Sequence, residues 1–149
     1  MSFGILFGAI GVVIATVLSG LGSATAMSMI GQAASGIIME DPGKFGQTLV
    51  LQAMGSTNGI YGLLIGFLIL TKTMTVTDMQ TGLFLLASSL PVGIVGYIAA
   101  LVQGKVLASG VILIGKRDGE LAKPMIYAAM IETFAVFALL ISFLMYNSV

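Results

Sequence analysis

The sequence predicts an all-α membrane protein with four transmembrane helices, arranged as two tandem-repeated helical hairpins. Of the 149 residues, 58% are hydrophobic and only 8% are charged, whereas a soluble domain carries about 25% charged residues. A chain with so few charges cannot cover a water-exposed surface, which places it in the membrane class. Its apolar residues form four long runs separated by short clusters of charges, and the second half repeats part of the first.

Each apolar run is long enough to cross a bilayer, which takes roughly 20 residues. We expect a first hairpin over residues 1–73, with spanning helices at about 5–38 and 45–70. The second hairpin is expected over residues 74–149, with helices at about 83–114 and 124–146. Pro42 and Pro124 follow charged connections, at the start of a helix where proline is tolerated. The runs lack the apolar–polar alternation of barrel strands. Because no basic residue precedes Lys44, we expect the first run to be a retained membrane helix and not a cleaved signal peptide.

The basic residues predict how the helices are oriented in a cell membrane. The first and third connections hold Lys44, Lys116, Arg117 and Lys123, whereas the second holds only Lys72. Cytoplasmic loops carry the excess of lysine and arginine. We therefore expect a multi-pass protein of the cell membrane, with the first and third connections in the cytoplasm and both termini on the outer side.

The two halves of the chain repeat in parallel. The segment LLIGFL, which begins at Leu63, recurs as LLISFL 76 residues later at Leu139. The same register aligns Thr57 with Thr133 and Tyr61 with Phe137. It also aligns Ser56 with Glu132, so the first hairpin has a neutral residue where the second has a carboxylate.

Small residues crowd the first and third runs and occupy most sides of the first. Small side chains let helix backbones approach closely in a membrane, where lipid supplies no hydrophobic drive for association. A four-helix monomer would leave each helix partly facing lipid. The pattern therefore favours a homo-oligomer in which the first and third helices pack most closely.

Glu132 lies near the middle of the fourth run and is the candidate functional residue. A carboxylate at this depth is costly unless it is neutralised or paired, and such acids mark ion or proton paths; the alternative is a carboxylate that only holds helices together. Gln103 and Lys105 lie at the same depth, because each is about as far from the third connection as Glu132 is. They are two residues apart, about 200° around a helix, so only one can face Glu132. An amide can supply a neutral oxygen, which favours Gln103 and places Lys105 on the opposite side.

One face of the second helix carries further polar groups. Met54, Thr57, Asn58 and Tyr61 follow the spacing i, i+3, i+4 and i+7. Hydrogen bonding between helices is one interpretation. The other joins this face to Glu132 and Gln103, with Tyr61 holding the carboxylate and Met54 offering its backbone carbonyl. These groups would form an all-oxygen set that suits a hard cation such as Na⁺, whereas a proton needs only the carboxylate and an acceptor.

Several classes of function are excluded by what the sequence lacks. It has no cysteine and no histidine, which removes thiol chemistry, histidine metal sites and histidine proton relays. No basic stripe exists for nucleic acid, and no glycine loop ending in Gly-Lys-Ser/Thr exists for ATP hydrolysis, so we expect no enzyme activity and no organic cofactor. A small multidrug-type proton-coupled exporter is the alternative class, although those proteins carry their acid in the first helix. A purely structural membrane oligomer is the third.

Five short segments, in order along nearly the whole chain, match one known family. They are Lys44-Phe45-Gly46-Gln47, Gly59-Ile60-Tyr61-Gly62, Ser89-Leu90-Pro91, Gln103-Gly104-Lys105-Val106 and Ala128-Ala129-Met130-Ile131-Glu132-Thr133. On these segments the sequence resembles the membrane-sector proteolipid of V-type ATPases, the c or K subunit, in its bacterial two-hairpin form.

The resemblance implies a ring of identical subunits that acts as the rotor of an ATP-driven pump, with ATP hydrolysis in other subunits. It implies a stator subunit with an essential arginine, central-stalk subunits on the cytoplasmic loops, and contact with membrane lipids. In sodium-translocating members, Na⁺ is bound at the positions of Met54, Thr57, Asn58, Gln103 and Glu132, which favours Na⁺ over H⁺ as the cargo. Asn58 stands where those members have glutamine, and Gly55 where they have proline.

Overall fold

The computed structural model describes residues 3–149, which form four long helical rods. The first rod comprises α1 (Phe3–Val13), a five-residue π-helix (Ile14–Leu18) and α2 (Ser19–Glu40). The second rod comprises a short 3₁₀ turn (Pro42–Lys44), α3 (Phe45–Met54) and α4 (Thr57–Thr73). The third rod is α5 (Met79–Lys116) and the fourth is α6 (Ala122–Asn147). All four rods are long and apolar enough to cross a membrane, which confirms the predicted all-α fold of two hairpins.

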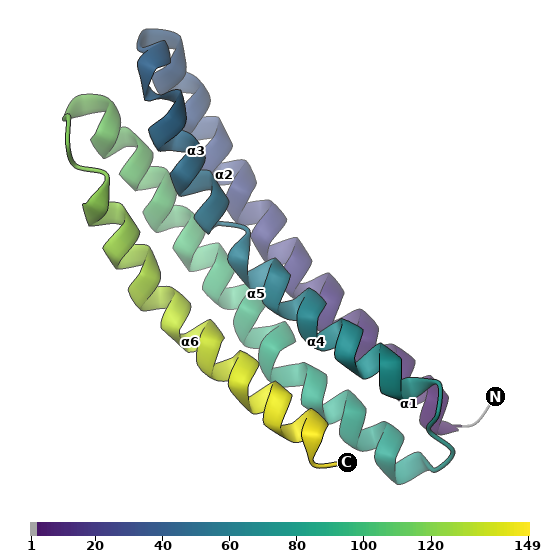
Figure 1. Ribbon diagram of the computed structural model, residues 1–149. Helices are drawn as coiled ribbons and strands as arrows, with labels where there is room; N and C mark the ends of the chain where they lie inside the picture. The colour runs from purple at the N-terminus through teal and green to yellow at the C-terminus, as the bar shows by residue number, and fades with distance from the viewer. Residues whose placement is uncertain (1–2) are drawn as a thin grey trace.

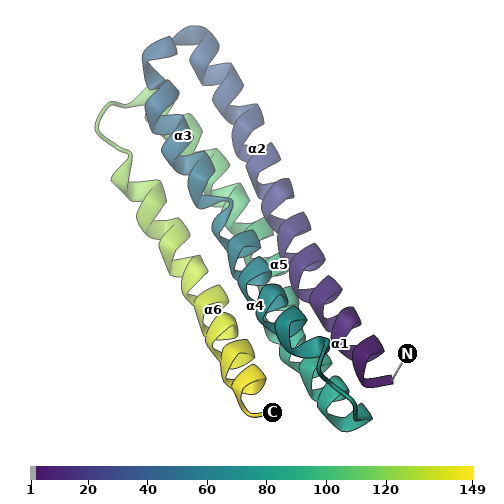
Figure 2. The same cartoon turned by 45° about the vertical axis from the view of Figure 1, so that its right-hand side comes forward.

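The four rods lie side by side along one elongated bundle (Figures 1 and 2). The start of α1, the end of α6 and the connection at residues 74–78 lie at one end, and the first and third connections lie at the other. The helix α5 contacts every other rod and has the most extensive contact with the first one. A Cβ atom added at Gly104 would lie 2.6 Å from the Cα atom of Ala26, so only glycine permits this approach. The close packing of the first and third helices is therefore as predicted.

A proline inside α5 makes a backbone link between three rods. Pro91 has no N–H group, and the next N–H, of Val92, donates to the Ser142 hydroxyl of α6 at 3.1 Å. The Val92 carbonyl accepts from the Ser19 hydroxyl of α2 at 3.0 Å. A proline leaves the carbonyl four residues earlier, here that of Ala87, without its helical donor. The two serines tie the backbone beside Pro91 to α2 and α6.

The connections are held by charged side chains. Asp78 caps α5 by accepting from the Thr81 N–H at 2.8 Å, and this backbone hydrogen bond lowers the pKa of Asp78. Lys44, at the end of the first connection, forms an ion pair with Asp118 of the third connection. The two hairpins are thus tied together at the end of the bundle that holds these connections.

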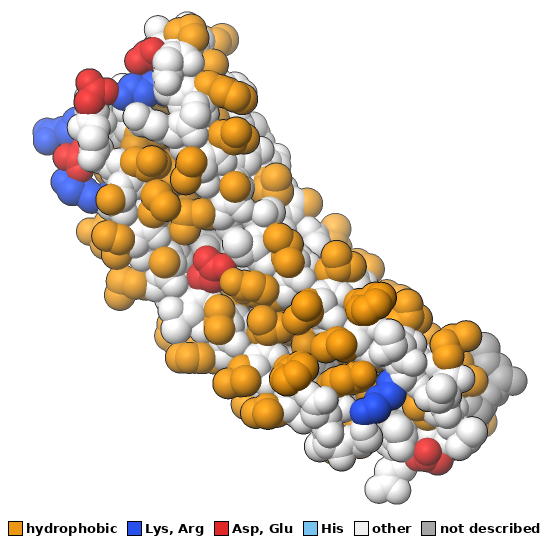
Figure 3. Space-filling model, viewed as in Figure 1, with side chains coloured by type: hydrophobic (Ala, Val, Ile, Leu, Met, Phe, Trp, Pro, Cys, Tyr) orange, Lys and Arg blue, Asp and Glu red, His pale blue; other side chains and the backbone are white. Residues whose placement is uncertain are grey.

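The surface of the bundle is apolar over most of its length. Figure 3 shows hydrophobic side chains along the rods and charged side chains gathered at the two ends. One acidic side chain is the exception and lies midway along this face, among hydrophobic neighbours.

Candidate functional site

Glu132 lies in the middle of α6, half-buried against the first hairpin. Among residues 3–149 it is the only acidic residue inside a spanning helix and away from its ends. The Tyr61 hydroxyl of α4 donates to its Oε1 at 2.6 Å. The Gln103 amide Nε2 of α5 donates to its Oε2 at 3.3 Å. Each carboxylate oxygen therefore has a donor, and the two donors come from two different helices.

A buried pair of amides extends this network away from Glu132. Asn58 and Gln103 are both fully buried, and the Asn58 Nδ2 donates to the Gln103 Oε1 at 2.8 Å. Gln103 also shares its amide hydrogens with the Ala128 carbonyl at 3.3 Å. The network thus runs from Asn58 through Gln103 and Glu132 to Tyr61.

One oxygen in this network has no partner. The Asn58 Oδ1 is buried and accepts no hydrogen bond from any residue that the structure describes. A buried acceptor left unsatisfied costs about 1–3 kcal/mol, so such groups in folded proteins call for a specific explanation. A buried neutral oxygen on a side chain that is linked through Gln103 to a carboxylate is a group that a cation would satisfy.

The second rod is broken next to this network. The α-helical bonding stops after Met54, where the Gly55 N–H donates to Gln52 and the Ser56 N–H donates to Ala53. The Thr57 hydroxyl donates to the Met54 carbonyl at 3.0 Å. The break therefore turns the Met54 carbonyl away from an ordinary helical bond and leaves it with a side-chain donor.

A serine of α2 supports the far side of the break. Ser23 is buried, and its Oγ accepts from the Gly59 N–H at 2.7 Å. The orphan N–H groups of a helix start need such acceptors. Sequence reasoning treated Ser23 only as one of many small residues in the first helix. A serine is both small and an acceptor, but sequence alone does not show which freed N–H group it faces.

The predicted site residues fall into two sets. Asn58, Tyr61, Gln103 and Glu132 are joined by continuous hydrogen bonds. Met54 and Thr57 are bonded to each other and reach the network only because Thr57 precedes Asn58 in the chain. Lys105 is exposed and is not a hydrogen-bond partner of Glu132.

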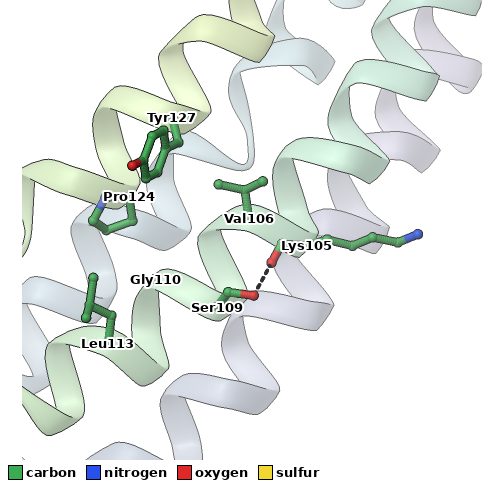
Figure 4. A pocket seen from close by; sticks show the side chains of 7 residues that line it. All are labelled: Lys105, Val106, Ser109, Gly110, Leu113, Pro124 and Tyr127. Atoms are coloured by element: carbon green, nitrogen blue, oxygen red, sulfur yellow. Dashed lines mark hydrogen bonds between the residues drawn. The ribbon is translucent and has the colours of Figure 1, made fainter.

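A pocket of about 340 Å³ lies near Lys105, between α5 and α6. Figure 4 shows Tyr127 and Pro124 on one side of it, while the ammonium group of Lys105 extends away from both. The Ser109 hydroxyl donates to the Lys105 carbonyl at 3.0 Å. None of the predicted ion-binding residues lines this pocket, so it is separate from the site at Glu132.

The donor set at Glu132 differs from that of a typical transition-metal centre. No group of three or more histidine, cysteine, aspartate or glutamate side chains occurs among residues 3–149. One carboxylate surrounded by amide, hydroxyl and carbonyl oxygens suits a hard, singly charged cation or a proton.

Comparison with known proteins adds an independent observation. The ATP synthase C-subunit family matches the chain twice, at residues 10–69 and again at residues 86–145. The chain is 39% identical to the V-type sodium ATPase subunit K of Enterococcus hirae, over 95% of this chain and 91% of that protein. It is 33% identical to the A-type ATP synthase subunit K of Methanocaldococcus jannaschii, over 95% of this chain and 62% of that protein.

Proposed function

Because the chain belongs to the ATP synthase C-subunit family, we propose that it is the rotor-ring subunit of a V-type rotary ATPase and carries one Na⁺ per subunit on Glu132. Proteins of this family are non-catalytic, ion-translocating subunits that form a ring within the membrane sector of an ATPase. The hydrogen-bonded network at Glu132, with its one unsatisfied oxygen, is the observation that supports this function most directly.

The proposed cargo site combines one charge with several neutral oxygens. Na⁺ would be held by the Glu132 carboxylate, the side-chain oxygens of Asn58, Gln103 and Thr57, and the Met54 carbonyl. Tyr61 would keep the carboxylate in place through its hydrogen bond of 2.6 Å. Oxygen ligands suit a hard cation, and the name of the E. hirae relative, a sodium ATPase subunit, also supports Na⁺. A proton on Glu132 is the alternative cargo.

Charge neutralisation gives the site its role in rotation. With Na⁺ bound, the site carries no net charge, so it can pass through the hydrocarbon of the membrane at a low cost. Once the ion has left, the carboxylate is charged and needs a cation, which an arginine of a stator subunit would supply. Rotation past that arginine would therefore exchange the ion, while central-stalk subunits on the cytoplasmic loops transmit the torque.

The register of the repeat predicts one ion per subunit in place of two. Ser56 occupies the position of Glu132 in the first hairpin, so four helices carry one ion where two carboxylates would carry two. A ring of a given circumference then moves fewer ions per turn, and each ion receives more of the energy of ATP. This favours pumping over ATP synthesis.

We also propose the arrangement of the chain in the membrane. Residues 1–73 and 74–149 form the two repeated hairpins, the first and third connections lie in the cytoplasm, and both termini lie outside. The excess of basic residues in those two connections supports this orientation.

Carbodiimide labelling of the purified ring tests the site and the cargo together. Dicyclohexylcarbodiimide should modify Glu132, increasing Na⁺ should slow the modification, and Glu132→Gln should abolish it. Sodium competes because it binds the ionised carboxylate, whereas the carbodiimide reacts with the protonated carboxyl group. Labelling that responds to pH but not to Na⁺ would identify a proton carrier, and recovery of the purified protein as a dimer would overturn the rotor assignment.

A further inference from the structure

The 76-residue register of the repeat also holds in the packing of the helices. In the first hairpin, Gly62 and Gly66 of α4 lie against their own first rod, close to Ser19 and Thr16. Their counterparts in the second hairpin are Ala138 and Ser142, which are buried, and Ser142 bonds to Val92 of its own first helix, α5. Both hairpins therefore close in the same way, and equivalent residues of α4 and α6 face equivalent directions.

The next face of the outer helix is covered in one hairpin and bare in the other. On α4, Asn58 and Ile65 are 0% exposed because this face packs against the second hairpin. Their counterparts on α6, Phe134 and Ile141, are 66% and 49% exposed. Phe137, the counterpart of Tyr61, is 57% exposed. Phe134, Phe137 and Ile141 follow the spacing i, i+3 and i+7 and thus share one side of α6, which we call the aromatic face.

On the opposite side of the molecule, α4 has an uncovered face whose counterpart on α6 meets the other hairpin. Glu132 and Leu139 of α6 meet the first hairpin, where Leu139 packs against the cluster that contains Ile65. Their counterparts are Ser56, which is half-buried, and Leu63, which is 62% exposed. Met27, also half-buried, takes the position of Gln103. The aromatic face, on one side of the chain, thus has no partner within the chain. The other side, which carries Ser56, Leu63 and Met27 and which we call the Ser56 side, offers the surface that would cover it.

We infer that the aromatic face of one copy packs on the Ser56 side of the next copy and repeats there the joint between the two hairpins of one chain. A second copy is the occupant that fits, because it presents the same fold at the same register. This inference rests on the proposed ring. It adds which faces meet and what chemistry lies between them.

The joint between copies is a dry counterpart of the ion site. Phe134 replaces Asn58, Phe137 replaces Tyr61, and Met27 replaces Gln103, so three oxygen-bearing side chains become apolar. The two phenylalanine rings already pack edge to face, with their centroids 6.2 Å apart. Two polar side chains are left, and each bonds to its own helix. Ser56 donates to the Ala53 carbonyl at 2.7 Å, and Thr133, the counterpart of Thr57, donates to the Ala129 carbonyl at 3.1 Å. The apolar joint therefore separates successive ion sites around the ring and binds no ion.

Paired cysteines test which faces meet, and the chain has no cysteine of its own. The variant Ser56→Cys/Phe137→Cys, treated in purified rings with a short bismaleimide, should give a ladder of linked copies on a denaturing gel. The two positions lie on opposite sides of one chain, so the link can form only between copies. The matched control is Ser56→Cys/Val136→Cys. Val136 is next to Phe137, and both Val136 and its counterpart Ile60 are exposed, which is expected of a position that faces lipid.

The expected result is a ladder with Phe137→Cys and single chains with Val136→Cys. Intact rings that give no ladder with Phe137→Cys, or the same ladder with both variants, would overturn the inference and leave the ring itself standing; in the first case lipid would be the occupant of the aromatic face. Recovery of the unmodified protein without a ring would instead overturn the proposed function, and this inference with it.

Discussion

The two hairpins share one register but contribute different parts of the site. The second rod is broken at Gly55 and Ser56, and the freed Met54 carbonyl and buried Asn58 lie beside the break. The equivalent positions in α6, Ile131 and Glu132, lie within a continuous helix. The first hairpin thus supplies neutral oxygens from an irregular backbone, and the second supplies the charge from a regular one. Duplication allows this division, because each copy of the repeat can lose what the other provides.

Placing a carboxylate in the first hairpin should have the largest effect, because it removes the main difference between the two hairpins. Ser56→Glu would place an acid against Phe134 and Phe137 of the next copy, where the positions of the two donors to Glu132 hold Phe137 and Met27. An acidic residue at the centre of a membrane helix costs about 3 kcal/mol. We expect rings of this variant to dissociate at a clearly lower temperature than the wild type in native electrophoresis.

Ser56→Gln is the matched control, because it adds nearly the same volume without the charge. Its rings should lie between the wild type and Ser56→Glu in stability. If Ser56→Glu rings are as stable as the wild type and take up two carbodiimide molecules per chain, the joint between copies is a second ion site and is not dry.

A smaller effect is expected from exchanging the aromatic residues at one equivalent pair of positions. Tyr61→Phe removes the donor that lies 2.6 Å from the Glu132 Oε1. A hydrogen bond to a charged group contributes about 1.5–3 kcal/mol, so about tenfold more Na⁺ should be needed to protect Glu132 from carbodiimide. The reverse exchange, Phe137→Tyr, adds a hydroxyl at the joint between copies and should leave the Na⁺ requirement unchanged. An equal shift in both variants would mean that the two joints are not separate sites.

The sequence predicts the network around Glu132 well because helix geometry alone fixes its main features. The equal distances of Gln103 and Glu132 from the third connection set their depth, and the structure joins them by a hydrogen bond. The i, i+4 and i+7 spacing places Asn58 and Tyr61 on one face, and both belong to the same network. These relations depend only on the rise and rotation per residue.

Sequence reasoning fails where the regular helix ends. The break after Met54 has no proline, and its local signal is the Gly55-Ser56 pair, which is weak because small residues are also frequent inside regular membrane helices. The role of Ser23 follows only once the freed Gly59 N–H is known. The bare aromatic face was also missed, although the register that reveals it can be read from the sequence. Periodicity tells which residues share a face, whereas burial by a neighbouring hairpin depends on the assembled fold.

The two hairpins also differ in the ion pairs of their charged connections, the first and the third. In the register of the repeat, Lys44 of the first connection corresponds to Glu120 of the third. Lys44 reaches across to Asp118 of the other hairpin, whereas Glu120 pairs with Lys123 of its own connection at 2.5 Å. Only the first of these two ion pairs joins the hairpins.

Removing the pair between hairpins should have the smallest effect. The hydrogen bond from Lys44, followed by its positive charge, lowers the pKa of Asp118 below its ordinary value of 3.8. The pair therefore contributes stability above about pH 3.8 and loses it as the pH falls through the lowered pKa. Because Asp118 is fully exposed, salt also screens the pair.

Asp118→Asn should speed amide hydrogen exchange in the third connection at neutral pH and low salt, and the difference from the wild type should vanish in high salt or acid. Glu120→Gln, which removes only the local pair, should leave exchange in the first connection unchanged; if it speeds exchange there, the two connections are coupled through more than Lys44.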